Sequence, residues 1–368
     1  MRIAIDARWN YHPGVSVYVA HLLDVLPGPA AERGIEIVAY ESPERPNPQS
    51  HPNLRKVQIT SGCYSPKAQL ELARSARRDG VDLFHAPFYW TPLVMHCPVL
   101  VTIHDLIPFL FPTYGAVHRE IVKAGYRVST RMATHVACIS ETTRRDVMAL
   151  LKVPAEKVTR VYNCLDTDFF SATPEPGEAE YLRERYGING PYVMTPSASN
   201  WQTKNLGGAL RAIERARDRS SISFQTVITG STSGLDATGL RPSLRETIVT
   251  GRVPFEDLPK LYRNATVFLS LSKYEGFGYP LGEAMSCGTA SISSRGGSLP
   301  EIAGDGALMY DGDDNEGVAD AIVALLASPE KRNALIEKAI SHSKTFSIDA
   351  YVDNMLNLYK VVAEQKYK

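Results

Sequence analysis

The feature that most constrains the fold of this chain is a repeated alternation of short apolar runs with longer amphipathic segments. In the first half, apolar runs of strand length lie at residues 3–6, 35–40, 56–59, 83–85, 99–103 and 135–139. Segments with helical periodicity lie at residues 16–26, 67–79, 116–133 and 141–151, and Ser140 is a suitable N-cap for the last of them. Strands that alternate with helices pair in parallel, because each helix carries the chain back across the sheet. The pattern predicts the doubly wound α/β fold class.

A change of composition at residues 171–190 divides the chain. Thr173-Pro-Glu-Pro-Gly177 comes before a short charged helix and a Gly-Ile-Asn-Gly turn, so we expect a linker here. The alternation then restarts, with strand-like runs at 192–195, 225–229, 247–250, 266–271 and 290–293 and helical segments at 205–217, 254–263 and 280–285. We therefore predict two Rossmann-like domains, at residues 1–170 and 191–345, and a C-terminal helix within 346–368 that packs near the first domain.

Charge and cysteine content exclude several classes of protein. Residues 1–165 carry 19 Lys and Arg against 14 Asp and Glu, the rest carry 21 against 26, and the whole chain is neutral. This bias is far weaker than that of a nucleic-acid binder, so no nucleic-acid partner is expected. The five cysteines stand singly, which indicates neither a zinc site nor a disulfide framework. No leader-like start and no run of 18 apolar residues is visible, so we expect a cytoplasmic protein.

A glycine-rich stretch follows the apolar run at 265–271 and is bracketed by two glutamates, in Glu275-Gly-Phe-Gly-Tyr-Pro-Leu-Gly-Glu283. Gly276 and Gly278 allow the backbone to approach a ligand closely, and a helix starting near Pro280 presents N–H groups to an anion such as a phosphate. Glu275 on the loop and Glu283 in the first helical turn are placed to accept hydrogen bonds from sugar hydroxyls and a ribose diol. The alternative is a plain strand-turn-helix joint in which Glu283 only favours the helix dipole. Spacing alone leaves both open.

The stretch resembles the donor-binding motif of glycosyltransferase family 4, because Ala-Met-Ser-Cys-Gly288 and Gly296-Gly-Ser-Leu-Pro-Glu-Ile302 follow it in the order of that family. The resemblance spans almost the full chain. Its other parts are Gly14-Val-Ser-Val-Tyr18, Thr102-Ile-His-Asp-Leu-Ile-Pro108, Thr203-Lys-Asn-Leu206 and the segment 251–262. It implies the GT-B fold, with the two Rossmann-like domains facing each other across a cleft. It also implies a retaining transfer of a hexose from a nucleotide-diphospho-sugar to a hydroxyl.

The resemblance also implies roles for individual residues. It makes His104, Lys204 and Glu275 the catalytic candidates, and Lys204, which opens a helix after a strand, is the cation expected on the donor diphosphate. The expected donor-binding residues are Gly14, Asp105, Asn205, Arg252, Gly276, Phe277, Gly278, Tyr279, Pro280, Leu281 and Glu283. Asp105 either caps the following turn or binds a hydroxyl, and both readings stay open.

One departure from the family pattern concerns a second cation. Many members carry an arginine about six residues before the lysine, where this chain has Ala198. Arg252 and Arg295 remain candidates by location. No Asp-x-Asp metal motif lies near the proposed site and no carboxylate of the first domain stands out as a nucleophile. We therefore expect no metal or other cofactor, and same-face attack in which the leaving phosphate oxygen takes the acceptor proton.

The His-Asp-Leu-Ile-Pro segment resembles mannosyl- and rhamnosyltransferases, which favours GDP-mannose or GDP-rhamnose as donor and polysaccharide biosynthesis as context. The acceptor is expected to be a glycan, a lipid-linked molecule or a small molecule. Basic residues recur at every fourth position in 116–133, at Arg119, Lys123, Arg127 and Arg131. They form either a solvated helix face or a contact with an anionic membrane or a lipid pyrophosphate.

Three other classes of protein compete with this interpretation. A dinucleotide oxidoreductase needs Gly-x-Gly-x-x-Gly after the first strand, which residues 5–14 lack. A sugar-nucleotide epimerase of the same fold would consume the donor without an acceptor. A non-catalytic nucleotide-sugar binding protein would show neither transfer nor hydrolysis. Fold analogy excludes neither of the last two.

Overall fold

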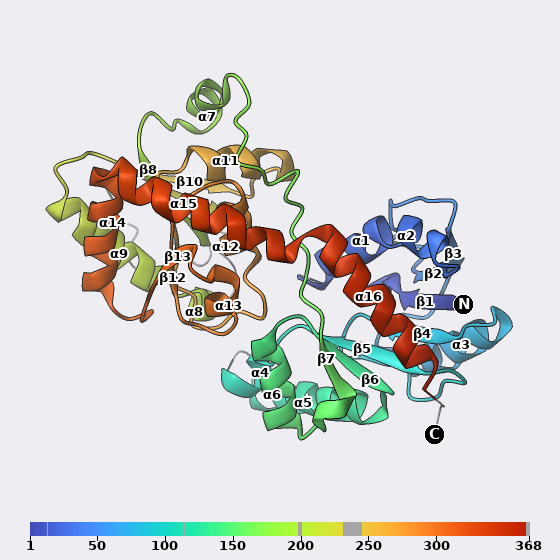
Figure 1. The fold of residues 1–368 in the computed structure, drawn as a ribbon. Coiled ribbons are helices and arrows are strands. Elements are labelled where there is room, and N and C mark those ends of the chain that lie inside the picture. Colours follow the sequence, from blue (N-terminus) through green and yellow to red (C-terminus); the bar gives the residue numbers. More distant parts are fainter. Residues whose placement is uncertain (13, 113–114, 198–200, 231–244, 366–368) are drawn as a thin grey trace. The chain divides into compact units, whose positions relative to one another are not determined.

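The computed structural model describes residues 1–12, 14–112, 115–197, 201–230 and 245–365 (Figure 1). The chain forms two compact units, Met1–Asn163 with Ile348–Lys368, and Cys164–Ser347. Each unit is built on one wholly parallel sheet with helices, which confirms the α/β fold class. The segment 171–190, expected as a linker, lies within the second unit and contains helix α7 (Glu178–Tyr186).

The first unit has a seven-stranded sheet in the order β3-β2-β1-β4-β5-β6-β7. Its strands are β1 (Arg2–Asp6), β2 (Glu36–Glu41), β3 (Leu54–Gln58), β4 (Leu83–Ala86), β5 (Val99–Ile103), β6 (His135–Cys138) and β7 (Val158–Arg160). Its helices are α1 (Val15–Val25), α2 (Pro27–Glu32), α3 (Pro66–Arg78), α4 (Ile107–Leu110), α5 (Ala116–Met132), α6 (Glu141–Leu151) and α16 (Ile348–Ala363), with the short 3-10 helices η1 (Ala7–Trp9) and η2 (Ala155–Lys157). Every residue of β4, β5 and β6 is buried, as expected for parallel strands covered on both faces.

Local signals set the helix starts in this unit. The hydroxyl of Ser140 accepts a hydrogen bond of 3.0 Å from the Thr143 N–H, so the predicted N-cap of α6 is confirmed. Ser65 caps α3 in the same way, through the Lys67 N–H. The helix α16 packs on β4 and β5 (Figure 1), and its inward face includes Tyr359. The C-terminal helix is therefore part of the first unit.

The second unit has a six-stranded sheet in the order β10-β9-β8-β11-β12-β13. Its strands are β8 (Tyr192–Ser197), β9 (Gln225–Gly230), β10 (Thr247–Gly251), β11 (Val267–Ser270), β12 (Ser291–Ser294) and β13 (Ala307–Tyr310). Besides α7, its helices are α8 (Trp201–Lys204), α9 (Leu206–Arg219), α11 (Leu258–Asn264), α12 (Tyr279–Ser286), α13 (Leu299–Ala303), α14 (Asn315–Ala327) and α15 (Pro329–Ser343), with 3-10 helices η4 (Phe255–Asp257) and η5 (Lys344–Phe346). The core of this unit is the layer between the sheet and the neighbouring helices α9 and α14.

Two further properties of the described chain bear on function. None of its helices is both long and apolar enough to cross a bilayer. All five cysteines are buried and free of disulfides.

Candidate active site

The strand order places the predicted site at the middle of the second sheet. The strand β8 pairs with β9 on one side and with β11 on the other, so the strand order changes direction at β8, which makes this the switch point of the sheet. Ligands of open parallel sheets bind at this switch point, outside the carboxyl ends of the strands. Lys204 follows β8 and Glu275 follows β11, so the two predicted catalytic residues of this unit lie on opposite sides of the switch point.

The structure joins these two residues in an ion pair. The Lys204 ammonium donates to both carboxylate oxygens of Glu275, with Nζ to Oε1 at 2.7 Å and Nζ to Oε2 at 2.9 Å. The side chains keep 25% and 15% of their exposure, so the pair is shielded from water and still reachable by a ligand. Sequence reasoning gave each residue its own ligand contact and missed the pair, because the pairing requires the strand order.

The loop after β12 fixes the position of Glu275. A Cβ added to Gly296 would lie 2.1 Å from the Ser272 carbonyl oxygen, and one added to Gly297 would lie 2.4 Å from the Glu275 carbonyl oxygen. The Ser298 hydroxyl donates to the carbonyl oxygens of Glu275 and Phe277, at 3.0 and 2.7 Å. The Gly-Gly-Ser sequence is thus required for two loops to lie against each other.

Side-chain hydrogen bonds complete the support. The Ser272 hydroxyl donates to Glu275 Oε1 at 2.6 Å. Asn205, a predicted donor-binding residue, donates its side-chain amide to the Gly312 carbonyl at 2.8 Å and has a left-handed conformation with φ of 51°. Asn205 therefore fixes the start of α9 next to Lys204, which is a positioning role.

The start of α12 offers fewer amide donors than its sequence suggests. Gly278 has φ of 102°, which suits glycine, and a Cβ there would also meet the Leu299 side chain at 2.8 Å. Pro280 has no N–H, and the N–H groups of Leu281 and Gly282 both donate to the Gly278 carbonyl. An anion would therefore depend on Lys204 and on the loop before the helix.

The side chains of the remaining loop residues divide between core and surface. Phe277 and Leu281 are buried, and the Phe277 ring packs edge-on against Phe346 with centroids 5.6 Å apart. Tyr279 and Pro280 are partly exposed, as are Gly276 and Glu275. The side chains of Phe277 and Leu281 therefore hold the loop, and only backbone atoms of these two residues are suited to ligand contact.

Glu283 lies one residue further into α12 than expected, because the helix begins at Tyr279 and not at Pro280. It is the fifth residue of the helix, whereas the sequence predicted the first turn. The Tyr262 hydroxyl donates to its Oε2 at 2.9 Å. Burial raises the pKa of Glu283 to about 7, and the bond from Tyr262 opposes that rise. Its carboxyl group therefore changes charge near neutral pH.

The structure leaves the second phosphate-binding cation open. Arg252 is exposed after β10, two strands from β8, and Arg295 follows β12 and donates to the Met309 carbonyl at 3.4 Å. Ala198, where many family members have arginine, lies outside the described residues.

In the first unit, His104 follows β5 at the carboxyl edge of the sheet. Its Nε2 lies 2.7 Å from the Pro87 carbonyl, which can only accept, so Nε2 carries the proton and Nδ1 is the acceptor of the neutral ring. Burial lowers the pKa of His104 to about 4 and outweighs the bond to Pro87, so the imidazole is neutral at physiological pH. The ring meets Tyr18 edge to face, with centroids 4.9 Å apart.

A buried chain of hydrogen bonds lies beneath His104. The Tyr18 hydroxyl lies 3.0 Å from Thr102 Oγ1, which lies 2.8 Å from His85 Nε2. His85 Nδ1 lies 2.7 Å from the Tyr359 hydroxyl on α16. Burial lowers the pKa of His85 to about 3, so the ring stays neutral and one nitrogen donates while the other accepts. Sequence reasoning missed this chain, which ties α16 to the residue that contacts His104.

The other two predicted residues of the first unit have structural roles at this edge. Asp105 Oδ1 accepts a hydrogen bond of 2.9 Å from the Ile107 N–H, so the turn-capping reading of Asp105 is observed. Gly14, with φ of 81°, precedes α1, and a Cβ there would meet open space. Glycine is therefore favoured at position 14 because of its positive φ, and not because a side chain would clash with a neighbour.

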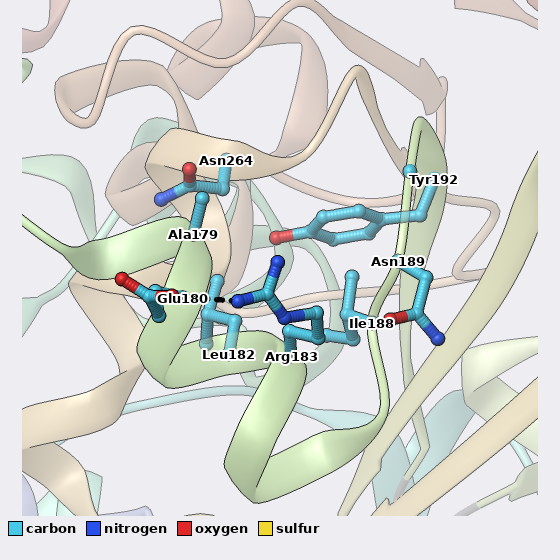
Figure 2. Close-up of a pocket in the computed structure, with 9 residues that line it drawn as sticks. Ala179, Glu180, Leu182, Arg183, Ile188, Asn189, Tyr192 and Asn264 are labelled. Carbon is cyan, nitrogen blue, oxygen red and sulfur yellow. Dashed lines mark hydrogen bonds and ion pairs between the residues drawn. The ribbon is translucent and has the colours of Figure 1, made fainter.

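A further pocket, of about 470 Å³, lies away from these residues, between α7 and the amino end of β8 (Figure 2). Figure 2 shows Arg183 reaching Glu180, to which it forms an ion pair of 2.7 Å, with Tyr192 and Asn264 on the opposite wall. Tyr192 is the first residue of β8 and Asn264 comes shortly before β11, so this pocket lies at the amino ends of these strands. Lys204 and Glu275 follow the carboxyl ends of the same strands, so the pocket is separate from the switch point. Among the described residues, no three His, Cys, Asp or Glu side chains gather as a metal site.

Two Rossmann-like units, each with a wholly parallel sheet, are the architecture of the GT-B fold. The sequence profile described as "Glycosyltransferase Family 4" matches residues 13–169, and "Glycosyl transferases group 1" matches residues 180–342. The chain therefore belongs to the family 4 type of glycosyltransferases.

Curated relatives agree with this assignment, and the solved structures agree with the fold. O-antigen chain mannosyltransferase B of Escherichia coli is 26% identical over 78% of this chain and 76% of its own length. D-inositol 3-phosphate glycosyltransferase of Corynebacterium glutamicum is 25% identical over 94% of this chain and 91% of its own. Among solved structures, Anabaena HepE in complex with UDP-glucose has a TM-score of 0.75 at 16% identity and covers 98% of this chain and all of its own. These findings give no support to the epimerase alternative.

Proposed function

We propose that this glycosyltransferase moves a hexose, with mannose or rhamnose favoured, from a nucleotide-diphospho-sugar to a hydroxyl group. The observation that carries the proposal is the Lys204–Glu275 pair at the switch point of the second sheet, held by the Gly296-Gly297 loop. The preference for GDP-mannose or GDP-rhamnose draws on the His104-Asp-Leu-Ile-Pro108 segment and on a relative that is a mannosyltransferase.

The hydrogen-bonding capacity of the pair fits both halves of such a donor. An ammonium group has three N–H donors, and Lys204 uses two on Glu275, which leaves one for a diphosphate oxygen. Oε1 of Glu275 accepts from Lys204 and Ser272, whereas among the described residues Oε2 accepts from Lys204 alone and keeps a lone pair for a sugar hydroxyl. Lys204 and Glu275 can therefore bind a donor without separating.

The reaction that we propose retains the anomeric configuration. The bond between the anomeric carbon and the diphosphate oxygen breaks, and the acceptor oxygen bonds to that carbon on the same face. The acceptor proton passes to the leaving phosphate oxygen. Negative charge develops on the diphosphate, where the Lys204 ammonium stabilises it. Since this cation neutralises the leaving group, we propose that the reaction needs no metal.

The neutral His104 is suited to binding a hydroxyl rather than to moving a proton. Its Nδ1 accepts hydrogen bonds, and its pKa near 4 makes it a weak base at neutral pH. We assign it to orienting a hydroxyl of the donor sugar or of the acceptor. The acceptor that we propose is a glycan, a lipid-linked molecule or a small molecule, with the enzyme in the cytoplasm and in peripheral contact with the anionic inner face of the membrane.

A donor screen followed by product analysis tests the proposal. Thermal unfolding is measured with GDP-, UDP- and ADP-sugars, because a ligand that binds only the folded state raises Tm. The stabilising donor is then supplied with candidate acceptors in EDTA, and the anomeric configuration of the product is determined by NMR. We expect a GDP-hexose to stabilise the protein and the product to keep the donor's configuration. Inversion, or activity that EDTA abolishes and Mn²⁺ restores, would contradict the mechanism. Donor binding with neither transfer nor hydrolysis would favour the non-catalytic binding protein.

A further inference from the structure

The helix α5 of the first unit turns an apolar stripe toward solvent. Val117, Ile121, Val128 and Met132 keep 77%, 60%, 45% and 48% of their exposure. With the exposed Ala124 they fall at positions i, i+4, i+7, i+11 and i+15, which share one side of a helix. The opposite side is buried against the unit and includes Tyr126. A surface helix normally exposes polar residues on its outward side.

The basic residues of α5 flank this stripe and do not form the outermost face. A step of four residues advances 400° around a helix, so the row from Arg119 to Arg131 drifts by about 40° at each step. At its start the row lies near the buried side: Lys123 pairs with Glu120 at 3.0 Å and lies 5.6 Å from the Phe109 ring centroid. At its end, Arg127 and Arg131 are exposed and border the stripe. The basic row therefore differs from a simple solvated face, which is one of the two alternatives that the sequence leaves open.

A cationic groove adjoins the C-terminal end of the stripe. It has a volume of about 430 Å³ and lies where the ends of α5 and α6 meet the residues around η2. Its basic lining residues are Arg127, Arg131, Lys152 and Lys157, and its apolar ones include Val128, Met132, Val153 and Pro154. The Lys157 ammonium donates to the Arg131 carbonyl at 3.0 Å, which joins the two sides of the groove.

The net positive charge around α5 and the groove favours an anionic partner. Residues 115–157 carry eight Lys and Arg against four Asp and Glu, a net charge of +4 that accounts for most of the +5 of residues 1–165. A helix whose apolar stripe is bordered by arginines lies in the plane of an anionic bilayer surface, with the stripe among the headgroups and the cations over lipid phosphates. A second copy of the chain would bring an equal positive charge to the contact.

We infer that the α5 stripe and the adjoining groove dock the first unit on an anionic lipid bilayer. The inference deepens the proposed function and rests on it in one respect: a lipid-linked acceptor is presented at such a surface. The vesicle binding itself does not depend on transfer activity.

Vesicle sedimentation tests the inference. The full chain is mixed with vesicles of phosphatidylcholine alone or with added phosphatidylglycerol, at low and at high salt. The stripe variant is Val117→Ser/Ile121→Ser/Val128→Ser, and the charge variant is Arg127→Gln/Arg131→Gln. The matched control is Leu70→Ser/Val361→Ser, because these residues are each 55% exposed on α3 and α16 of the same unit.

We expect salt-sensitive binding of the wild type to the anionic vesicles only. Each lost arginine near the surface weakens binding about fivefold, so the charge variant should bind roughly twenty-fivefold more weakly. The stripe variant should lose binding at least tenfold, and the control should bind like the wild type. Equal binding of wild type and stripe variant would overturn the inference. So would a dimer, measured by sedimentation equilibrium, that the stripe variant abolishes.

Donor hydrolysis without lipid separates this inference from the proposed function. Unchanged hydrolysis in a stripe variant that has lost vesicle binding supports the surface assignment. Absence of donor hydrolysis and transfer in the wild type would contradict the proposed function, and the vesicle result would still decide whether α5 docks on lipid.

Discussion

Replacement of Gly296 by alanine should remove most activity through the backbone alone, since residue 296 contributes no side chain to the site. The added Cβ would lie 2.1 Å from the Ser272 carbonyl oxygen, and real Cβ atoms essentially never come closer than 3.0 Å to such an atom. The two loops must therefore separate by about 0.9 Å, which is 3.0 minus 2.1. This displacement moves Glu275, whose carbonyl is bound by the Ser298 N–H in the loop that shifts.

A displacement of about 1 Å at a catalytic group costs on the order of a hundredfold in rate, or about 2.7 kcal/mol in the activation free energy. We expect kcat of Gly296→Ala to fall by about that factor, with Tm lowered by only a few degrees. The matched control is Gly190→Ala in the same unit, where a Cβ meets nothing within 4 Å and φ is ordinary. If Gly296→Ala does not fold, Ser298→Ala removes the hydroxyl bonds to the same loop and serves in its place. Wild-type kcat in a folded Gly296→Ala would refute the reasoning.

Four other predictions concern charge, pH and the buried chain. Lys204→Ala and Glu275→Ala should each lower kcat about a hundredfold. The double variant should lose much less than the product of these two factors, because paired residues act as a unit. A double variant whose loss in kcat equals that product would contradict the pairing. The KM for the donor should rise as pH falls through about 7, since Glu283 accepts hydrogen bonds from hydroxyl groups best when ionised. Tyr262→Phe should move the midpoint of this rise to higher pH, because it removes the bond that opposes the raised pKa of Glu283. A donor KM that is constant from pH 6 to pH 8 would contradict this prediction. The same raised pKa predicts that the stability contributed by Glu283 is full below its unfolded pKa near 4.5 and is lost as pH rises through about 7, a dependence that Glu283→Gln should remove in urea unfolding. Tyr359→Phe should lower the unfolding free energy by roughly 1 to 3 kcal/mol, because it leaves the buried His85 Nδ1 without its hydrogen-bond partner. An unchanged unfolding free energy would show that this buried chain of hydrogen bonds does not stabilise the fold.

The sequence predicts those features that depend only on residues close together along the chain. The hydroxyl of Ser140 needs only the three residues after it to cap α6, and the apolar runs of β5 and β6 are buried whatever their partners. The placement of Lys204 and Glu275 at one sheet edge also follows from each residue's position after a strand.

Features that depend on strand order or on tertiary neighbours were missed. The bond between Lys204 and Glu275 exists because β8 and β11 are adjacent, although 69 residues lie between Ser197 at the end of β8 and Val267 at the start of β11. The sequence predicts no helix or strand in the segment containing β13, α14 and α15, because its helices are stabilised largely by packing on α9 and α12. On α5, the regular spacing of the basic residues is visible in the sequence, whereas the exposure of the apolar stripe depends on how the helix packs in the fold.

Calorimetric titration of GDP and of a GDP-hexose into the wild type, Lys204→Ala and Glu275→Ala tests the central claim most directly. If the ammonium binds the diphosphate and the carboxylate binds the sugar, Lys204→Ala should weaken both ligands. Glu275→Ala should leave GDP binding intact or tighter, since it releases the ammonium, and should remove the extra affinity that the hexose confers. Unchanged affinity of both variants for both ligands would contradict the account.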